Sequence, residues 1–311
     1  MLKYIAKRTL MMIPVIIGIS LIIFSIMELS PGDPVTLMLG DGASQQSITE
    51  LREEMGLNDN FAVKYVRYVK NALMGDFGIS YRNKVPVINE IASRFPTTLN
   101  LTFWGVLLSV VIGIPVGVIS AIKQYTIIDT FSLFSALILT AMPAFWLGLM
   151  LILLFSLKLN LLPATGVDTW KHFIMPSITL AAASMATIIR MTRSTMLEVI
   201  RQDYIRTAKS KGAGECRIVF KHALRNALLP IVTIIGLNFG YQLGGAIVTE
   251  SVFAMPGIGT LMVAAVRTKD TPIVMASVLF VAVLAGVINL LVDVLYVYID
   301  PRLKSEYVSS K

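Results

Sequence analysis

The stretch FPTTLNLTFWGVLLSVVIGIPVGVISAI, from Phe95 to Ile122, contains no charged side chain over 28 residues. A membrane-spanning helix needs about 20 apolar residues, because it rises about 1.5 Å per residue and must cross about 30 Å of hydrocarbon. The whole chain shares this character: 55% of its 311 residues are hydrophobic, 15% are charged, and the mean hydropathy is +0.74. Since soluble domains carry about 25% charged residues, the composition indicates a chain whose solvent is lipid.

Five further apolar runs qualify or nearly qualify as spans. Prolines inside several of them are compatible with membrane helices, because neighbouring groups can satisfy the freed backbone carbonyl. The first run follows three basic residues but is too long for a signal peptide, and residues 28–34 offer no small-residue cleavage site, so an uncleaved anchor is expected. The sequence therefore predicts an all-α integral membrane protein with six transmembrane helices. The predicted spans are residues 9–27, 95–122, 130–157, 173–189, 227–249 and 271–292.

Basic residues are distributed unequally between the two sides of this arrangement. The side that holds both termini carries 16 Lys and Arg, whereas the short loops of the other side carry 4. Because short cytoplasmic loops are enriched in Lys and Arg, both termini are predicted to be cytoplasmic. The chain then divides into residues 1–29 with the first span, an extracellular segment of residues 30–94, and a transmembrane core of residues 95–311. The net charge of +8 belongs to this bias, so no nucleic-acid partner is expected.

The segment of residues 30–94, called the long loop below, is expected to be ordered. Ser47 and Glu50 have the spacing of a helix-capping box, and apolar residues follow on one helical face. A second amphipathic helix is predicted over residues 61–73, with Gly75 as its end. Two interpretations remain open for this segment: a packed cap over the spans, or a docking surface for an extracellular partner.

Residues 190–225, called the basic segment below, connect the fourth and fifth predicted spans. They carry nine basic and three acidic side chains. A solvated loop rarely shows helical order, but apolar residues recur here at helical spacing between positions 196 and 205. Gly212 and Gly214 predict a turn, and the apolar positions 218–220 begin a second short helix. A helix–turn–helix that projects from a membrane is suited to dock in a groove of a soluble partner.

Two stretches of the basic segment carry a family resemblance. Residues 204–212, YIRTAKSKG, and 222–230, HALRNALLP, are similar to the coupling segment of ABC importer permeases, and most similar to the dipeptide, oligopeptide and nickel branch, in the first of its two permease subunits. The general importer motif begins Glu-Ala-Ala and has glycine four positions after the second alanine. This chain has Arg206-Thr207-Ala208 with Gly212 at that spacing, and its departure at the glutamate resembles the peptide branch.

Further family-like stretches occur in order along the chain. They are residues 31–34 (PGDP), 75–78 (GDFG), 95–99 (FPTTL), 250–259, 292–296 and 300–302. Together with the six predicted spans, they imply the type I ABC importer permease fold, with an ordered extracellular segment between helices 1 and 2.

The resemblance implies a set of partners and a membrane. A second six-helix permease subunit would complete the pathway, two ABC ATPase subunits would bind ATP and Mg²⁺, and an extracellular substrate-binding protein would deliver a di- or oligopeptide across a bacterial cytoplasmic membrane. Nickel complexes or glutathione are alternative substrates in similar permeases. The residues matched to the ATPase-coupling loop are Tyr204, Arg206, Thr207, Ala208, Lys209, Lys211, Gly212 and Ala213.

The chain itself carries no motif for chemistry. No glycine is followed by lysine, which excludes a Walker A loop. No His-Glu-x-x-His motif or nucleophile–base pair occurs, and His172 and His222 lie too far apart in sequence to suggest a metal site. We therefore predict that the chain is not an enzyme and binds no cofactor. A stand-alone ion-coupled transporter is the alternative of a different class, but such carriers need ionisable groups deep in their spans.

Polar residues inside the spans are candidates for the pathway. Asn238, Tyr241 and Gln242 are predicted to share one face of the fifth span. They could line a peptide pathway or make interhelical hydrogen bonds, and Asn289 has the same two interpretations. Pro143 is a candidate for a kink that helps gating, or for a simple irregularity of packing. Outside the spans, Glu250 and Asp270 are gate or docking candidates, although surface solvation is the more expected role for both.

Overall fold

The computed structural model describes residues 2–29, 33–40 and 42–299. Within these ranges the fold is helical throughout, and the one extended pairing is an isolated antiparallel bridge between Ile79 and Pro86. Five helices are long and apolar enough to span a membrane, and a sixth span results if one bent pair is counted together. The five are α1 (Leu2–Leu29), α5 (Val87–Ile122), α8 (Lys171–Ile200), α10 (Arg225–Val252) and α12 (Thr271–Ile299). The six predicted runs are confirmed as helical.

The third predicted run is a broken span. It forms α6 (Ile127–Ala141), α7 (Ala144–Leu151) and the π-helical turn η1 (Ile152–Lys158), with a bend of 101° between its two parts. The break falls at Met142, whose ψ of 124° is extended, and Pro143. Proline has no N–H for the helix ladder and pushes the preceding residue out of the helical region. The structure thus has a break at Pro143 that is larger than a simple kink, and a role of this break in gating stays a prediction.

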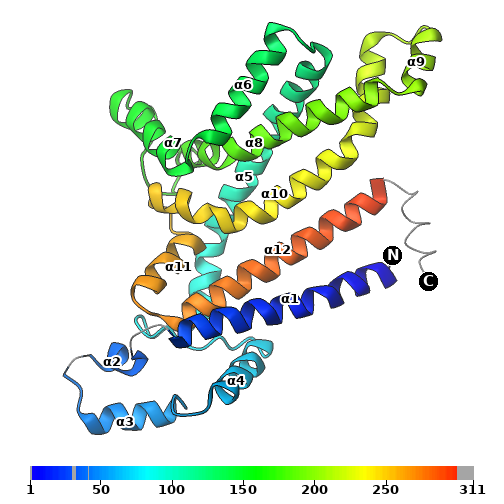
Figure 1. The fold of residues 1–311 in the computed structure, drawn as a ribbon. Helices are drawn as coiled ribbons and strands as arrows, with labels where there is room; N and C mark the ends of the chain where they lie inside the picture. Colours follow the sequence, from blue (N-terminus) through cyan, green and yellow to red (C-terminus); the bar gives the residue numbers. More distant parts are fainter. Residues whose placement is uncertain (1, 30–32, 41, 300–311) are drawn as a thin grey trace.

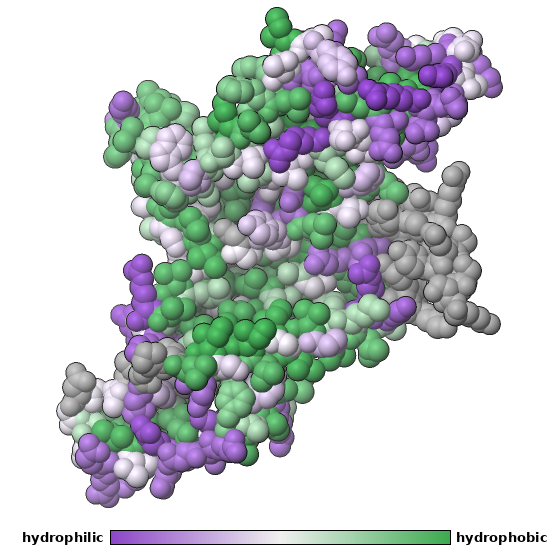
Figure 2. Space-filling model, in the orientation of Figure 1, coloured by the Kyte–Doolittle hydropathy of each residue, from purple (hydrophilic) through white to green (hydrophobic). Residues whose placement is uncertain are grey.

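The centre of the bundle is built by α5, α8 and α10. Glycines allow α5 and α8 to pack closely: a Cβ atom on Gly117 would lie 2.5 Å from the Cβ atom of Thr192. In Figure 1, α12 lies between α10 of this centre and α1, which packs along its other side. Figure 2 shows hydrophobic residues over much of the surface of the long helices, while hydrophilic residues gather at the end of α8 and over the long loop. That distribution fits a body surrounded by lipid between two polar ends.

The described part of the long loop is ordered, as predicted, and contains three helices before α5 begins at Val87. These are α2 (Pro34–Leu39), α3 (Gln45–Glu54) and α4 (Phe61–Leu73). The predicted capping position was wrong, because Ser44 and not Ser47 caps α3: the Ser47 N–H donates to Ser44 Oγ at 3.1 Å. Gly75, at φ +80°, follows the end of α4 as expected. The aromatic ring of Phe24 packs on Phe61, with 5.2 Å between ring centroids, which docks α4 against α1.

Candidate functional site

The basic segment forms a helix–turn–helix at one end of the bundle. Helix α8 continues to Ile200, an extended Gln202 breaks it, and α9 (Asp203–Ser210) follows. Gly212 then turns the chain at φ +78°, a conformation that glycine adopts without steric cost. The π-helical element η2 (Arg217–Leu224) leads directly into α10. The predicted order of helix, glycine turn and helix is confirmed, and α9 projects beyond the central helices in Figure 1.

One apolar cluster fixes the basic segment to the spans. Ile205 of α9 and Ile218 of η2 are 1% and 5% exposed, and they pack in the same cluster as Val118 of α5 and Met196 of α8. Asn226 adds a polar tie, because its Nδ2 donates to Tyr204 Oη at 3.1 Å and to the His222 carbonyl at 2.7 Å. The cluster therefore ties the segment to three spans, α5, α8 and α10.

The residues assigned to the coupling loop lie on α9 and the turn at Gly212, and they differ in exposure. The 44% exposed Tyr204 ring covers the junction with α10, and Ala208 and Ala213 are half-buried. The ion pair between Arg206 and Asp203 is 3.7 Å long and open to solvent, so it contributes little to stability. The side chains free to meet a partner belong to Arg206, Thr207, Lys209 and Lys211, next to the exposed Gly212.

A buried ion pair that the sequence did not indicate joins Arg193, at the start of this segment, to Asp129. Arg193 of α8 donates to both oxygens of Asp129, from Nε at 2.6 Å and from Nη2 at 2.8 Å. The Ser120 hydroxyl and the Tyr125 N–H also donate to this carboxylate, at 2.6 and 3.0 Å. Asp129, which is 3% exposed, thus joins α5, the α5–α6 turn, α6 and α8. Both charges were assigned to loops at the sequence level, and nothing in their positions, 64 residues apart, indicated a pair.

Glu250 is buried, so the expectation of surface solvation was wrong. Its side chain is 0% exposed. Glu250 Oε1 accepts from the Thr98 hydroxyl at 2.6 Å, and Oε2 accepts from the Thr260 N–H at 3.1 Å. Thr98 in turn accepts from the Ile258 N–H at 2.9 Å. The carboxylate therefore sits at the N-terminus of α11 (Ile258–Arg267), where free N–H groups favour an anion, and joins α5, α10 and α11.

The glycine-rich stretch after Glu250 is explained by this carboxylate. A Cβ atom on Gly257 would lie 2.2 Å from the Glu250 carboxyl carbon, and one on Gly259 would lie 2.8 Å from Oε2. Any larger residue at either position would displace the carboxylate. The family-like stretch of residues 250–259 is thus a structural unit in which an acid and two glycines fit one another.

Asp270, the second acid expected on the surface, is 2% exposed, so that expectation was wrong as well. It accepts from the Ser80 hydroxyl and from the N–H groups of Tyr81 at 3.2 Å and Arg82 at 3.4 Å. Burial, together with the charge of Asp270, raises the pKa of Tyr81 to about 12. Asp270 thereby attaches the long loop to the corner between α11 and α12, and α11 is held by a buried acid at each end.

The structure separates the predicted polar cluster of the fifth span. Gln242 is 2% exposed and its Nε2 donates to Ser184 Oγ of α8 at 2.6 Å, whereas Tyr241 is 79% exposed. Gln242 thus makes the interhelical bond of the packing interpretation, with Asn238 half-buried one turn before it. Asn289 lies on α12 in a groove of about 250 Å³ that it shares with Arg8 and other residues of α1. A role of these four residues in a pathway stays a prediction.

Comparison with known proteins assigns the family. Residues 113–305 match the binding-protein-dependent transport system inner membrane component, and residues 1–102 match the N-terminal part of such components. The chain belongs to this family, the permeases of ABC importers. The permease is 42% identical to the dipeptide transport system permease protein DppB of Alkalihalophilus pseudofirmus, across 98% of this chain and 100% of that protein.

Two other relatives are similar over comparable lengths. The oligopeptide transport system permease protein AppB of Bacillus subtilis is 44% identical, across 98% of this permease and 100% of the relative. The glutathione transport system permease protein GsiC of Escherichia coli K12 is 42% identical, across 98% and 99%. Among solved structures, the MetNI methionine ABC transporter in an inward-facing conformation matches with a TM-score of 0.58 at 22% identity, across 68% of this permease and 97% of that chain. That likeness supports the type I fold.

Proposed function

We propose that this permease forms half of the translocation pathway of an importer for di- and oligopeptides and couples that pathway to two ATPase subunits. The observation that carries the coupling role is the projecting α9–Gly212 surface, which one apolar cluster fixes to three spans. The substrate class comes from the relatives, whose names specify dipeptide, oligopeptide and glutathione transport.

Partner motion would change the permease by population shift. Closure of the ATPases on ATP would move the coupling surface, and α8, α10 and α5 would follow because they share its apolar cluster. ATP shifts the balance between inward-open and outward-open states only to the extent that it favours one of them. In this proposal ATP and Mg²⁺ bind to the partner subunits, and this chain contributes no cofactor site.

The proposed topology follows the distribution of basic residues. Both termini and the basic segment lie in the cytoplasm, residues 30–94 lie outside, and residues 95–311 form the core in a bacterial cytoplasmic membrane. A second six-helix permease would complete the pathway, and an extracellular binding protein would deliver the substrate. Glutathione is the second candidate substrate, because a glutathione permease is as similar to this chain as the dipeptide permease is.

Purification of the tagged chain from native membranes in mild detergent, followed by mass spectrometry, tests the proposed assembly. We expect a second six-span permease and two ATPases in stoichiometric amounts. Repeated purification of the chain alone, in native lipid, would contradict the importer assembly. Uptake of labelled dipeptide and labelled glutathione by vesicles that contain the assembly then separates the two substrates.

Gly212→Val is expected to uncouple ATP hydrolysis from uptake. The position has φ +78°, and a Cβ atom there would have no neighbour within 4 Å, so the side chain has room but the backbone is strained by about 1–2 kcal/mol. This strain would weaken docking of the loop on the ATPase by about tenfold, and we expect uptake per ATP to fall with it. Gly214→Val is the matched control, because Gly214 has equal space and no positive φ. Equal uptake by both variants would refute the coupling assignment.

A further inference from the structure

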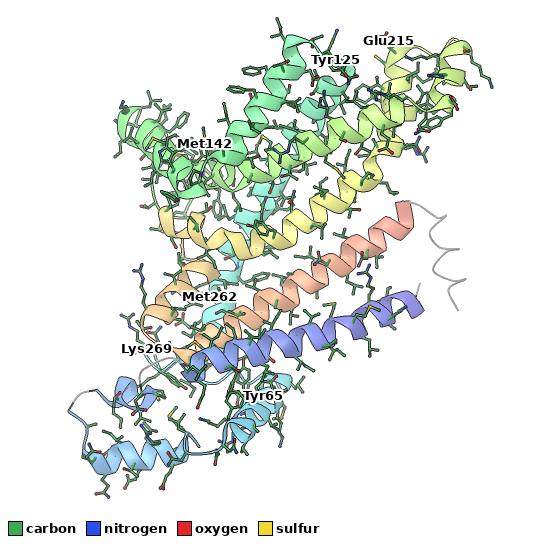
Figure 3. The ribbon with its side chains drawn as sticks, in the orientation of Figure 1. Tyr65, Tyr125, Met142, Glu215, Met262 and Lys269 are labelled. Atoms are coloured by element: carbon green, nitrogen blue, oxygen red, sulfur yellow. The ribbon has the colours of Figure 1, made fainter. Side chains whose placement is uncertain are left out.

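A cavity of about 740 Å³ lies between the long loop and the ends of α1 and α12. Its size is within the roughly 300–1,000 Å³ that small-molecule sites occupy. Figure 3 labels two residues in this region. Lys269 lines the cavity at the corner between α11 and α12, and Tyr65 lies on α4, next to α1. No role in the coupling mechanism requires such a space.

The apolar lining of the cavity is adaptable. Four methionines contribute to it from four different elements: Met27 of α1, Met38 of α2, Met55 beside α3 and Met275 of α12. Methionine is unbranched and polarisable, so methionine-rich surfaces accept ligands of varied shape. Such walls suit a ligand whose side chains differ from one molecule to the next.

The charged lining presents both signs side by side. Asp33 and Arg52 form an ion pair of 2.7 Å, with side chains 25% and 41% exposed. Glu28 and Lys64, which also line the cavity, form a second pair. Partly exposed pairs of this kind are held weakly. The ammonium group of a ligand can therefore pair with the carboxylate of such a pair, while the carboxylate of the ligand pairs with its Lys or Arg. No charge is then left unpaired.

One polar atom of the lining has no partner among the residues that the structure describes. The Oη atom of Tyr68 is buried and makes no hydrogen bond there. Burial raises the pKa of this phenol above its usual value, so it remains a neutral donor. Buried polar groups are nearly always satisfied. Tyr68 lines the cavity, so a ligand carbonyl that displaces the side chains covering this hydroxyl would supply the missing acceptor.

We propose that this cavity is a second substrate site, which binds a short peptide with free termini on the outer side of the permease. The charged pairs receive the two termini, the methionines receive the side chains, and Tyr68 donates to a backbone carbonyl. The choice of ligand and the outer location rest on the proposed function.

The test is equilibrium binding of tritiated leucyl-phenylalanine to the full chain, with its copurifying subunits, in nanodiscs without binding protein. We expect saturable binding that unlabelled peptide displaces and that N-acetyl-leucyl-phenylalaninamide, which lacks both terminal charges, does not. Tyr68→Phe is expected to weaken binding by about fivefold, the value of one hydrogen bond. Tyr65→Phe is the matched control, because Tyr65 lies on the same helix and its hydroxyl contacts Ser20 of α1 instead.

Each other outcome overturns the proposal. Absence of saturable binding, equal competition by the blocked peptide, or equal effects of the two tyrosine variants would show that the cavity is not a peptide site. A phospholipid that remains bound in native mass spectrometry and resists displacement by peptide would assign the cavity to lipid. ATP-driven uptake, measured separately with binding protein present, would persist if only the cavity proposal fails, and would be absent if the importer function itself fails.

Discussion

Glu250→Ala is expected to destabilise the permease by about 3–5 kcal/mol, the largest single-residue effect that the structure predicts, because two buried donors lose their acceptor. The substitution removes the acceptor for the Thr98 hydroxyl and the Thr260 N–H at a site with 0% exposure. Each buried donor that loses its partner costs about 1–3 kcal/mol. The apparent Tm of the protein in nanodiscs should fall by more than about 5 °C. Glu53→Ala, on the exposed surface of α3, is the control and should change it little.

Glu250→Gln shows whether the charge or only the shape is needed. Glutamine has one oxygen acceptor where the carboxylate has two, so it can accept from the Thr98 hydroxyl or from the Thr260 N–H but not from both. If the carboxylate is ionised and held by the N-terminus of α11, glutamine should lose a large part of the stability that alanine loses. A glutamine variant as stable as the native protein would mean that the folded protein keeps this acid protonated.

Much of the fold could be predicted because lipid restricts the alternatives. A run of about 20 apolar residues has one stable conformation in hydrocarbon, the helix. The glycine turn of the basic segment was predictable for a similar reason, since Gly212 adopts a conformation that other residues avoid. Local steric rules also placed the break at Pro143, but they did not predict a bend of 101°.

The buried polar contacts could not be predicted, because their partners are distant in sequence. Glu250 follows the fifth span directly and looks like a solvated loop residue, yet its partner Thr98 lies 152 residues away. Asp270 is bound by Ser80 at a separation of 190 residues. A hydrophobic pattern identifies which face of a helix is buried, but not whether a charge at its end finds N–H groups. The sequence offered one indication that Glu250 is buried, namely the two closely spaced glycines that follow it, Gly257 and Gly259.

The two acids give α11 a defined place in the proposed mechanism. Glu250 joins the start of α11 to α5, and Asp270 joins its end to the long loop. A motion of the pathway helices would thus reach the long loop through α11 without passing through a flexible connection. The outer segment and the core would respond to the binding protein and to the ATPases as connected parts.

Arg193→Ala is expected to destabilise the permease by about 2–4 kcal/mol and to abolish coupled uptake. It leaves the Asp129 carboxylate, 3% exposed, with only the Ser120 hydroxyl and the Tyr125 N–H. An uncompensated buried charge costs more than the pair gained. Arg206→Ala, which breaks an exposed pair, is the stability control and should cost less than about 1 kcal/mol.

A double-mutant cycle of Asp129→Ala and Arg193→Ala separates the pair from its surroundings. If the bidentate contact joins α6 to α8, the double variant should lose about 2 kcal/mol less stability than the sum of the losses in the two single variants. Arg193→Lys keeps the charge but loses the two-point geometry, so it should retain stability better than uptake per ATP. That split distinguishes a group that transmits motion from one that only packs. A rigid link between α6 and α8 requires both hydrogen bonds from Arg193 to Asp129 at once. The transmission role would therefore be contradicted if the lysine variant lost the same fraction of its stability and of its uptake per ATP. Additive single effects in the cycle would contradict it as well.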